Sequence, residues 1–425
     1  MFKKSNLFFL FLVVICNSCN NDSNNSKEEI GDTIPRKTST WPIPILDTFY
    51  KKIIYIKNQY RLTFNEKISD SLSNLEGFNQ KQLENSYKKN IINIFEGLGV
   101  KLKDKDFRFV SEYGVIIDLK ISDEGLSILR KNPQLENISE NFLFKEENDK
   151  FKLECDIENE VLPWGIKRVS KDSPKTNGNF HTAWIIDSGI DPTHPDLNVQ
   201  VSKCTSFVKN SPDIIDRSGH GTHVAGIIGA KRNEIGVVGI APGAPIVSVK
   251  VIDNGIGKID EYLNGLKYVR NFAKKGDVLN ISLQRIGRVE EEERLIRDIA
   301  AKGVYIVLSA GNSDFNQSRN PEDVFFARIY PARIDGENVF TISSFDEGDT
   351  YSSFSNFGNP IDFSAPGGRI LSTLPMSFGC GYGEKSGTSM AAPHISGILL
   401  LKGKVTPGPT VFNDPDTKKD KIGTE

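Results

Sequence analysis

The feature that most constrains the fold is an alternation, between residues 161 and 425, of short apolar segments with segments of helical spacing. Strands that are apolar on both faces are typical of a parallel sheet with helices packed on each side. We therefore predict an α/β domain with a doubly wound, mostly parallel sheet, whose functional groups gather at the carboxyl ends of its strands. The predicted strands are Ala183–Ile186, Ile246–Val251, Val278–Ile281, Val304–Leu308 and Val339–Ile342, and the clearest helices are Asp260–Lys275 and Glu290–Lys302.

A second, smaller α/β pattern occupies residues 45–147. Tyr87, Ile91 and Phe95 recur at helical spacing, which predicts a helix that buries one face. Residues 115–121 alternate apolar with other side chains, as in a half-buried strand, and Ser122 follows as a helix N-cap. We predict a small ferredoxin-like α+β domain here. A charged linker at 148–160, which is also a candidate processing region, joins it to the larger domain.

The first 44 residues have a different composition from the rest. A basic start, the apolar run Leu7–Ile15 and the polar residues after Cys19 are typical of a secretory signal peptide over residues 1–19. The run is shorter than the ~20 residues that span a bilayer. Residues 20–44 are rich in Asn, Ser, Lys and Pro, which predicts a flexible tether. A formal net charge of −2 shows no excess of Lys and Arg, so we expect no nucleic-acid partner.

Three cysteines lie beyond the signal, namely Cys155, Cys204 and Cys380. Their spacing is not that of a metal site. Export would permit a disulfide between Cys204 and Cys380. Buried free thiols are the alternative, because the sequence gives no distance between these residues.

Three short motifs stand where the predicted sheet would bring functional groups together. Asp187 ends an apolar strand, His220 lies between two glycines at the start of an apolar helix, and Ser389 begins another helix. Taken singly, the Asp is a turn residue, the Ser is an N-cap, and His220 with His223 is a metal-ligand pair that lacks an obvious third ligand. Together, an acid, an imidazole and a hydroxyl can perform nucleophilic catalysis, with an oxyanion bound at the helix N-terminus.

The order Asp, His, Ser is one of the known triad orders. The motifs around these residues resemble the signature blocks of the subtilisin-type (S8) serine peptidases, and the resemblance runs from about residue 163 to residue 425. It implies a peptidase S8 catalytic domain over 161–425 that hydrolyses protein or peptide substrates. In that family Ser389 would be the nucleophile, His220 the general base and acid, and Asp187 its orienting partner. His223 and His394 match positions that are structural.

A fourth motif, Ser309-Ala310-Gly311-Asn312, follows a predicted strand. The resemblance assigns Asn312 as the donor that binds the oxyanion. It also implies a substrate-binding edge, which relatives continue with small glycines. Gln284 and Arg285 depart from that pattern, so we expect a narrower cleft or a preference for an acidic substrate group. The implied substrate-binding residues are Ser282, Leu283, Gln284 and Gly311.

The resemblance implies no cofactor for catalysis but does imply a structural calcium ion. Asp196 matches an Asp downstream of the catalytic one, and residues 231–237 match a loop in the helix after the catalytic His. Oxygen ligands of this kind suit Ca²⁺. A capped turn without a metal is the alternative. The implied ligands are the side chains of Asp196 and Asn233 and the carbonyls of Lys231, Ile235 and Val237.

The smaller domain also gains a role from the resemblance. Residues 113–144 resemble the family's inhibitory I9-type propeptide, which implies a self-processing zymogen cut between about Phe144 and Glu160. A permanent extra domain is the alternative. Cys19 resembles the lipidated Cys of a bacterial lipoprotein signal, although Cys16 stands where that pattern has Leu. We expect an extracytoplasmic monomer, either anchored by lipid at the cell envelope or simply secreted.

Two other functions compete with a peptidase. The first is a cell-surface binding protein that keeps peptide affinity without turnover, and the intact set Asp187, His220, Ser389 and Asn312 argues against it. The second is a triad esterase or amidase. The residues around Ser389 are not the Gly-x-Ser-x-Gly elbow of the α/β-hydrolases, and the triad order differs from that of their fold.

Overall fold

The structure is a computed structural model, and its contacts divide the chain into two units, Met1–Leu143 and Phe144–Glu425. The predictions for the signal peptide, the tether and Cys19 lie outside the described residues. Within the described residues, no helix has the length and apolar character to cross a membrane. The structure describes residues 55–64, 80–97, 100–111, 114–119, 121–133, 135–145, 151–155, 157, 159–170, 180–312, 329–416 and 418–425.

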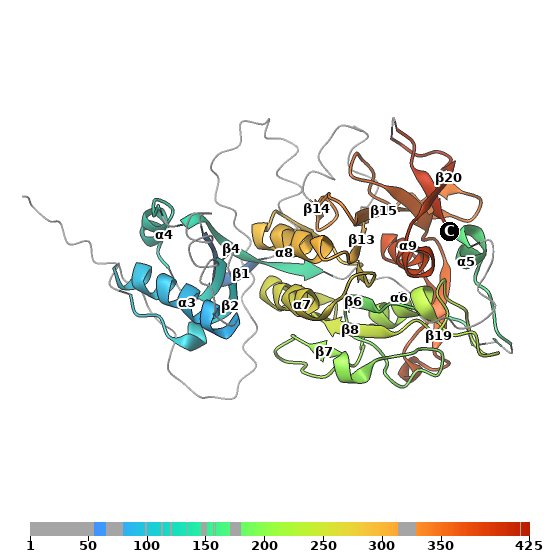
Figure 1. Ribbon diagram of the computed structural model, residues 1–425, viewed down its shortest axis with the longest axis horizontal. Helices are drawn as coiled ribbons and strands as arrows, with labels where there is room; N and C mark the ends of the chain where they lie inside the picture. Colours follow the sequence, from blue (N-terminus) through green and yellow to red (C-terminus); the bar gives the residue numbers. More distant parts are fainter. Residues whose placement is uncertain are drawn as a thin grey trace, which may run out of the picture. The chain divides into compact units, whose positions relative to one another are not determined.

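The first unit has the ferredoxin-like topology predicted from its sequence (Figure 1). Its strands lie in the order β2-β3-β1-β4, and each neighbouring pair is antiparallel. The residues Tyr87, Ile91 and Phe95 are buried, as their spacing predicts, and Ser122 accepts a hydrogen bond from the N–H of Gly125 as an N-cap. The elements are β1 (Tyr55–Phe64), α3 (Gln80–Glu96), β2 (Phe107–Ser111), β3 (Gly114–Asp118), α4 (Asp123–Leu129) and β4 (Leu135–Lys145).

The second unit is built on the predicted parallel sheet. Its strands lie in the order β20-β21-β17-β15-β13-β11-β6-β8-β7, and only β20 and β21 pair in antiparallel fashion along this path. All five residues of β6 and of β8 are buried, which explains why these strands are nearly continuous apolar runs. The strands are β6 (Ala183–Asp187), β7 (Thr205–Ser206), β8 (Ile246–Lys250), β11 (Val278–Ile281), β13 (Tyr305–Ser309), β15 (Val339–Asp346), β17 (Phe363–Pro366), β20 (Thr406–Thr410) and β21 (Lys421–Thr424).

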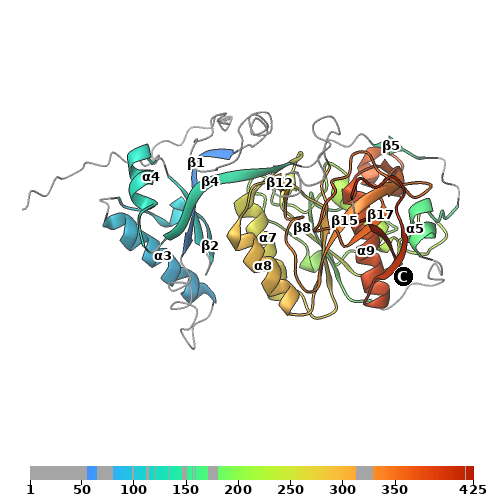
Figure 2. The same cartoon turned by 90° about the horizontal axis from the view of Figure 1, so that it is seen from above.

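Helices cover both faces of this sheet. Figure 2 shows α7 and α8 side by side on one face and α9 on the other, and α6 packs beside α9. The main core lies between the sheet and the α6–α9 pair, where Ile185, Val224 and Ile395 belong to one apolar cluster. The helices are α5 (Trp164–Val169), α6 (His220–Gly229), α7 (Ile259–Phe272), α8 (Glu290–Ala301) and α9 (Thr388–Lys402). The shorter strands are β5 (Lys152–Leu153), β9 (Ile252–Asp253), β10 (Ile256–Lys258), β12 (Arg285–Ile286), β14 (Ile329–Tyr330), β16 (Thr350–Tyr351), β18 (Ile370–Thr373) and β19 (Tyr382–Lys385).

The cysteine pairing is one that the sequence analysis did not consider. Cys155 and Cys380 form a disulfide, with their Cα atoms 5.2 Å apart, which rules out the Cys204–Cys380 pair that was left open as one alternative. Cys380 stands just before β19, and β19 pairs with β5, which brings Cys155 beside it. Cys204 has a free thiol, which donates to the carbonyl of Gln200 and accepts the N–H of Ser248. The segment 151–155, expected to be linker, is therefore part of the second unit.

Candidate active site

The predicted acid and imidazole meet at the carboxyl edge of the sheet. Asp187 is the last residue of β6, and His220 is the first residue of α6. Nδ1 of His220 lies 2.8 Å from Oδ1 and 3.0 Å from Oδ2 of Asp187. Both residues are buried, with 0% and 2% of Asp187 and His220 exposed. A carboxylate in this place fixes the ring tautomer and favours the imidazolium form.

A buried carboxylate that the sequence analysis missed holds the start of α6. Oδ1 of Asp216 accepts the hydroxyl of Ser188 at 3.0 Å and the N–H of Gly219 at 2.8 Å. Its Oδ2 accepts the N–H and hydroxyl of Thr222, at 2.8 and 2.7 Å. Gly219 has a φ of 80°, a backbone conformation that favours glycine, immediately before His220. A capping-type residue four positions before His220 was the only available sequence signal.

Ser389 lies in the first turn of α9, the helix that packs against α6. Its hydroxyl donates to the carbonyl of Ser282 at 3.2 Å, and the hydroxyl of Ser282 donates to the carbonyl of Ser389 at 2.9 Å. Ser282 immediately follows β11, so the parallel neighbours β6 and β11 bring Asp187 and Ser282 to the same edge of the sheet. The three predicted triad residues thus come from three elements. Asp187 lies at the end of β6, and the packed helices α6 and α9 bear His220 and Ser389.

Asn312, the predicted oxyanion donor, is attached to the same helix start. Its Oδ1 accepts the N–H of Thr388 at 2.8 Å, and the hydroxyl of Thr388 accepts the N–H of Gly311 at 3.0 Å. With Oδ1 held at the start of α9, Nδ2 is the donor end of the Asn312 amide. Gly311 has a φ of 86°, and a Cβ there would lie 2.2 Å from Oε1 of Gln284. This position therefore requires glycine.

The expected role of Arg285 in selecting an acidic substrate group is not supported by its contacts. Arg285 is 5% exposed, and its guanidinium contacts the carboxylate of Glu292 and the carbonyl of Gly287. The guanidinium also lies 5.4 Å from the centre of the Tyr330 ring, so the positive charge of Arg285 interacts with groups inside the fold. Leu283 is 2% exposed, which places its side chain in the interior. Of the implied substrate-binding residues Ser282, Leu283, Gln284 and Gly311, only Gln284 is not buried.

His223 and His394 have the contacts of structural residues. Nε2 of His223 lies 3.0 Å from the carbonyl of Ile370 and 3.1 Å from that of Gly383, whereas His220 faces Asp187. The imidazoles of His220 and His223 therefore bind different partners, and this arrangement does not suit a metal ion shared between them. Burial lowers the pKa of His223 well below its usual value and that of His394 to about 4, so both rings are neutral near pH 7.

The predicted calcium ligands gather around Asp196. Its Oδ2 accepts the N–H of Val237 at 3.0 Å and the hydroxyl of Tyr382 at 3.2 Å. Its Oδ1 is buried and has no hydrogen-bond partner in the described part of the chain. Burial raises the pKa of Asp196 to about 6. A buried carboxylate oxygen without a partner, on a side chain that binds the loop 231–237 through Val237, fits an oxygen-seeking cation.

The loop that follows α6 has a second acidic contact, which the sequence analysis did not anticipate. Glu160 accepts the guanidinium of Arg232 at 2.8 Å and the N–H groups of Asn233 and Glu234 at 2.8 and 3.1 Å. The N–H of Val161 donates to the carbonyl of Gly236 in the same loop. The segment entering the catalytic unit is thus bound to the candidate calcium loop.

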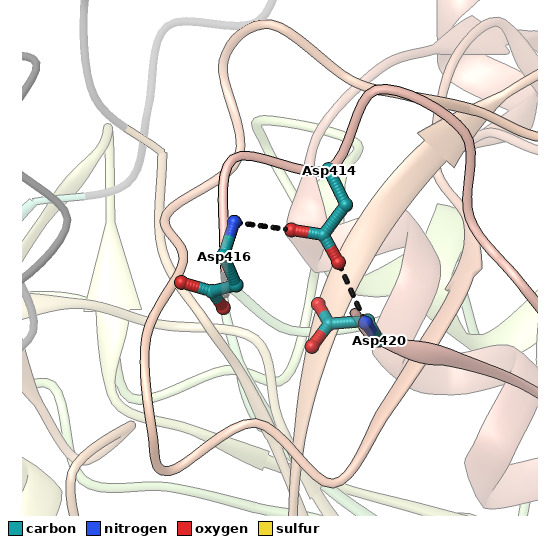
Figure 3. Close-up of side chains that lie close together, drawn as sticks. All are labelled: Asp414, Asp416 and Asp420. Atoms are coloured by element: carbon teal, nitrogen blue, oxygen red, sulfur yellow. Dashed lines mark hydrogen bonds between the residues drawn. The ribbon is translucent and has the colours of Figure 1, made fainter. Parts of the chain in front are cut away.

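Three carboxylates gather between β20 and β21, outside the predicted sites. Figure 3 shows Asp414 between Asp416 and Asp420, and one oxygen of each lies within 4.8 Å of the others. Asp414 accepts the N–H groups of Asp416 and Asp420, at 2.9 and 2.6 Å, and Asp420 accepts the hydroxyl of Ser343 at 2.6 Å. Burial, with the charges of its two neighbours, raises the pKa of Asp420 to about 7. These contacts attach the loop to β15.

Comparisons with known proteins give matches to the second unit and beyond it. A family model described as the subtilase family matches residues 184–411. M-protease of Shouchella clausii (strain KSM-K16) is 32% identical over 290 residues, which are 67% of this chain and 68% of that protein. Subtilisin BL of Lederbergia lenta is 36% identical over 244 residues, or 56% of this chain and 83% of that protein. The crystal structure of a cold adapted subtilisin-like serine proteinase matches with a TM-score of 0.51 and 28% identity, covering 61% of this chain and 96% of that one.

Proposed function

The chain belongs to the subtilase family and is a serine-type endopeptidase acting on protein or peptide substrates, and we propose that Asp187, His220 and Ser389 are its catalytic triad. One observation carries this assignment: Nδ1 of His220 lies 2.8 Å from the buried carboxylate of Asp187. The helix that begins at His220, α6, packs against α9, which bears Ser389. A carboxylate buried beside one ring nitrogen leaves the other to exchange protons with a nucleophile.

The proposed reaction proceeds in two halves. The hydroxyl of Ser389 attacks the peptide carbonyl carbon, and its proton passes to Nε2 of His220. The negative charge that forms on the carbonyl oxygen is bound by Nδ2 of Asn312 and by the backbone N–H of Ser389, in the first turn of α9. Collapse breaks the C–N bond, and His220 gives its proton to the leaving amine. A water molecule, activated by His220 in the same way, then hydrolyses the acyl-enzyme.

A fluorophosphonate probe and casein test this proposal together. We expect the protein to be labelled and to cleave casein, and Ser389→Ala to abolish both. Labelling without cleavage of any protein or peptide would favour the esterase alternative. Neither labelling nor cleavage would favour a peptide-binding protein and would contradict the proposed triad.

We further propose that the first unit is an inhibitory propeptide and that the chain matures by cutting itself. Residues 151–155 support a cut upstream of Phe151. A cut after Cys155 would leave the fragment bearing that residue tied to Cys380 by the disulfide, while β5 remained paired with β19.

N-terminal sequencing and gels with and without reductant test this position of the cut. We expect a mature chain that begins between about Phe144 and Phe151 and has one mass in both gels. A chain starting between 156 and 161, or a fragment released only by reduction, would contradict it.

For its location, we propose export and lipid attachment at Cys19, because a short apolar run and a small residue precede that Cys. The modified chain would be a monomer held at the cell envelope. Labelling cells with palmitate tests the anchor, since the label should be present in the wild type and absent in Cys19→Ala. A wild-type protein that takes up no label would indicate simple secretion.

We propose that Asp196 and the loop 231–237 hold a calcium ion. The unpaired Oδ1 of Asp196 supports this, as do the carbonyls of Lys231, Ile235 and Val237, which accept no backbone N–H among the described residues. Asn233 would supply a further side-chain oxygen. When bound, the ion would neutralise the buried carboxylate and fix the loop; it has no part in the proposed reaction.

A further inference from the structure

We infer that Gln284 makes this peptidase selective for a small side chain, such as that of Ala or Gly, on the residue whose carbonyl is attacked. The inference rests on the proposed function of Ser389 and Asn312 and names the substrate class for that site. It depends on the position of one amide, which bridges two segments that follow neighbouring strands of the sheet.

Gln284 connects these segments through both ends of its side-chain amide. Its Oε1 accepts the N–H of Asn312 at 2.9 Å, and its Nε2 donates to the carbonyl of Asn312 at 3.3 Å. The first segment follows β11 and the second follows β13, its parallel neighbour. The amide thus satisfies both backbone polar groups of Asn312 and crosses from one segment to the other.

The same two segments hold the reacting groups. Ser282, two residues before Gln284, exchanges hydrogen bonds with Ser389, and Asn312 is attached to Thr388. A carbonyl carbon within reach of the Ser389 oxygen, with its own oxygen at the Asn312 amide, must therefore lie between the segments. The side chain of that substrate residue leaves from the adjacent carbon, so it approaches the place that the Gln284 amide occupies.

A hydrogen or methyl group can be accommodated without moving Gln284, whereas an aromatic side chain would displace its amide from Asn312. Displacement would leave the N–H and carbonyl of Asn312 and the amide itself in need of new partners. The two residues that flank Gln284 offer no competing basis for selection. Arg285 is engaged by Glu292, and Leu283 is buried, so neither of these two presents a charge or an apolar surface to the substrate.

Paired peptide p-nitroanilides that differ only in the last residue, Ala or Phe, test the inference. We expect the mature wild-type enzyme to have a kcat/KM for the Ala substrate at least ~10-fold above that for the Phe substrate. In Gln284→Gly and Gln284→Ala, the ratio of kcat/KM for the Phe substrate to that for the Ala substrate should rise by ~10-fold or more, whatever the change in overall rate. Arg288→Ala is the matched control, since the Arg288 side chain is 59% exposed on the same segment, and it should keep the wild-type ratio.

Several results would overturn the inference. One is a wild-type preference for Phe, and another is an Ala-to-Phe ratio of kcat/KM that both Gln284 variants leave unchanged while they still hydrolyse the Ala substrate measurably. Fluorophosphonate labelling of each variant checks that it is folded. A failure of the proposed function would look different, because neither substrate would be cut and no label would depend on Ser389. The inference would then fall with that function.

Discussion

The carboxylate of Asp216 accepts both the backbone N–H and the hydroxyl of Thr222, two residues beyond His220 in α6. The same carboxylate binds the N–H of Gly219, the residue before His220. His220 is therefore flanked on both sides by backbone groups attached to one buried side chain. Its distance from Asp187 depends on this support as well as on their own hydrogen bond.

Replacing Asp216 should damage stability and turnover together. Asp216→Ala leaves at least three buried donors without an acceptor, and each hydrogen bond to a charged group is worth about 1.5–3 kcal/mol. We expect the free energy of unfolding to fall by at least about 3 kcal/mol and kcat by at least tenfold, measured by denaturant titration and peptide hydrolysis. Asp213→Ala, at a side chain 43% exposed, is the control and should change both only slightly. A fully active Asp216→Ala enzyme would contradict the support role.

Removing the side-chain amide of Asn312 should lower turnover with little effect on substrate binding. We expect Asn312→Ala to reduce kcat by roughly 10²–10³, the loss known for an oxyanion asparagine in a subtilisin, while KM changes little. The reason is that the amide donates to an oxygen whose charge develops only in the transition state. Asn210→Ala, at an exposed residue, is the control. An unchanged kcat would remove Asn312 from the mechanism.

Calcium should stabilise the catalytic unit through Asp196. We expect chelation with EDTA to lower the melting temperature and excess Ca²⁺ to restore it, because the ion binds the folded loop and not the unfolded chain. Asp196→Ala should remove this response, whereas Asp335→Ala, at an exposed carboxylate, should keep it. A wild-type melting temperature that does not respond to either treatment would leave the loop as an ordinary turn.

Asp420 should make the protein less stable as the pH rises. Its pKa is raised to about 7 in the folded state, above the ordinary value of 3.8, so the folded state binds the proton more tightly than the unfolded one. Its contribution is therefore fully present below pH ~4 and is lost as the pH rises through about 7. Denaturant titrations between pH 4 and 8 should show a smaller decrease in Asp420→Asn than in the wild type. Asp335→Asn is the control, and identical pH profiles for all three proteins would contradict this role.

The parallel sheet could be predicted, and the candidate triad residues could be selected, because each has a local pattern. Strands buried on both faces are apolar along their length, and a strand-end Asp, a glycine-flanked His and a helix-start Ser are visible without coordinates. Contacts between distant segments had no such pattern. The two residues of β5 are exposed, so no apolar periodicity in the sequence indicates that this strand pairs with β19 or that Cys155 bonds to Cys380.

Two further features show how tertiary contacts override residue type. From the sequence, we expected the charge of Arg285 to be available to the substrate. Instead, the carboxylate of Glu292, on the following helix, binds its guanidinium inside the fold. No strand was predicted after residue 404, where Pro407 and Pro409 cannot donate to a sheet ladder. They are tolerated because β20 lies at the edge of the sheet. Neither outcome follows from local sequence.

Mapping the fluorophosphonate adduct by peptide mass spectrometry tests the central assignment most directly. The account predicts one modified residue, Ser389, with labelling slowed by at least about 10³-fold in His220→Ala, because the imidazole must accept the hydroxyl proton. An adduct on any other residue, or labelling of Ser389 at an unchanged rate without His220, would contradict it.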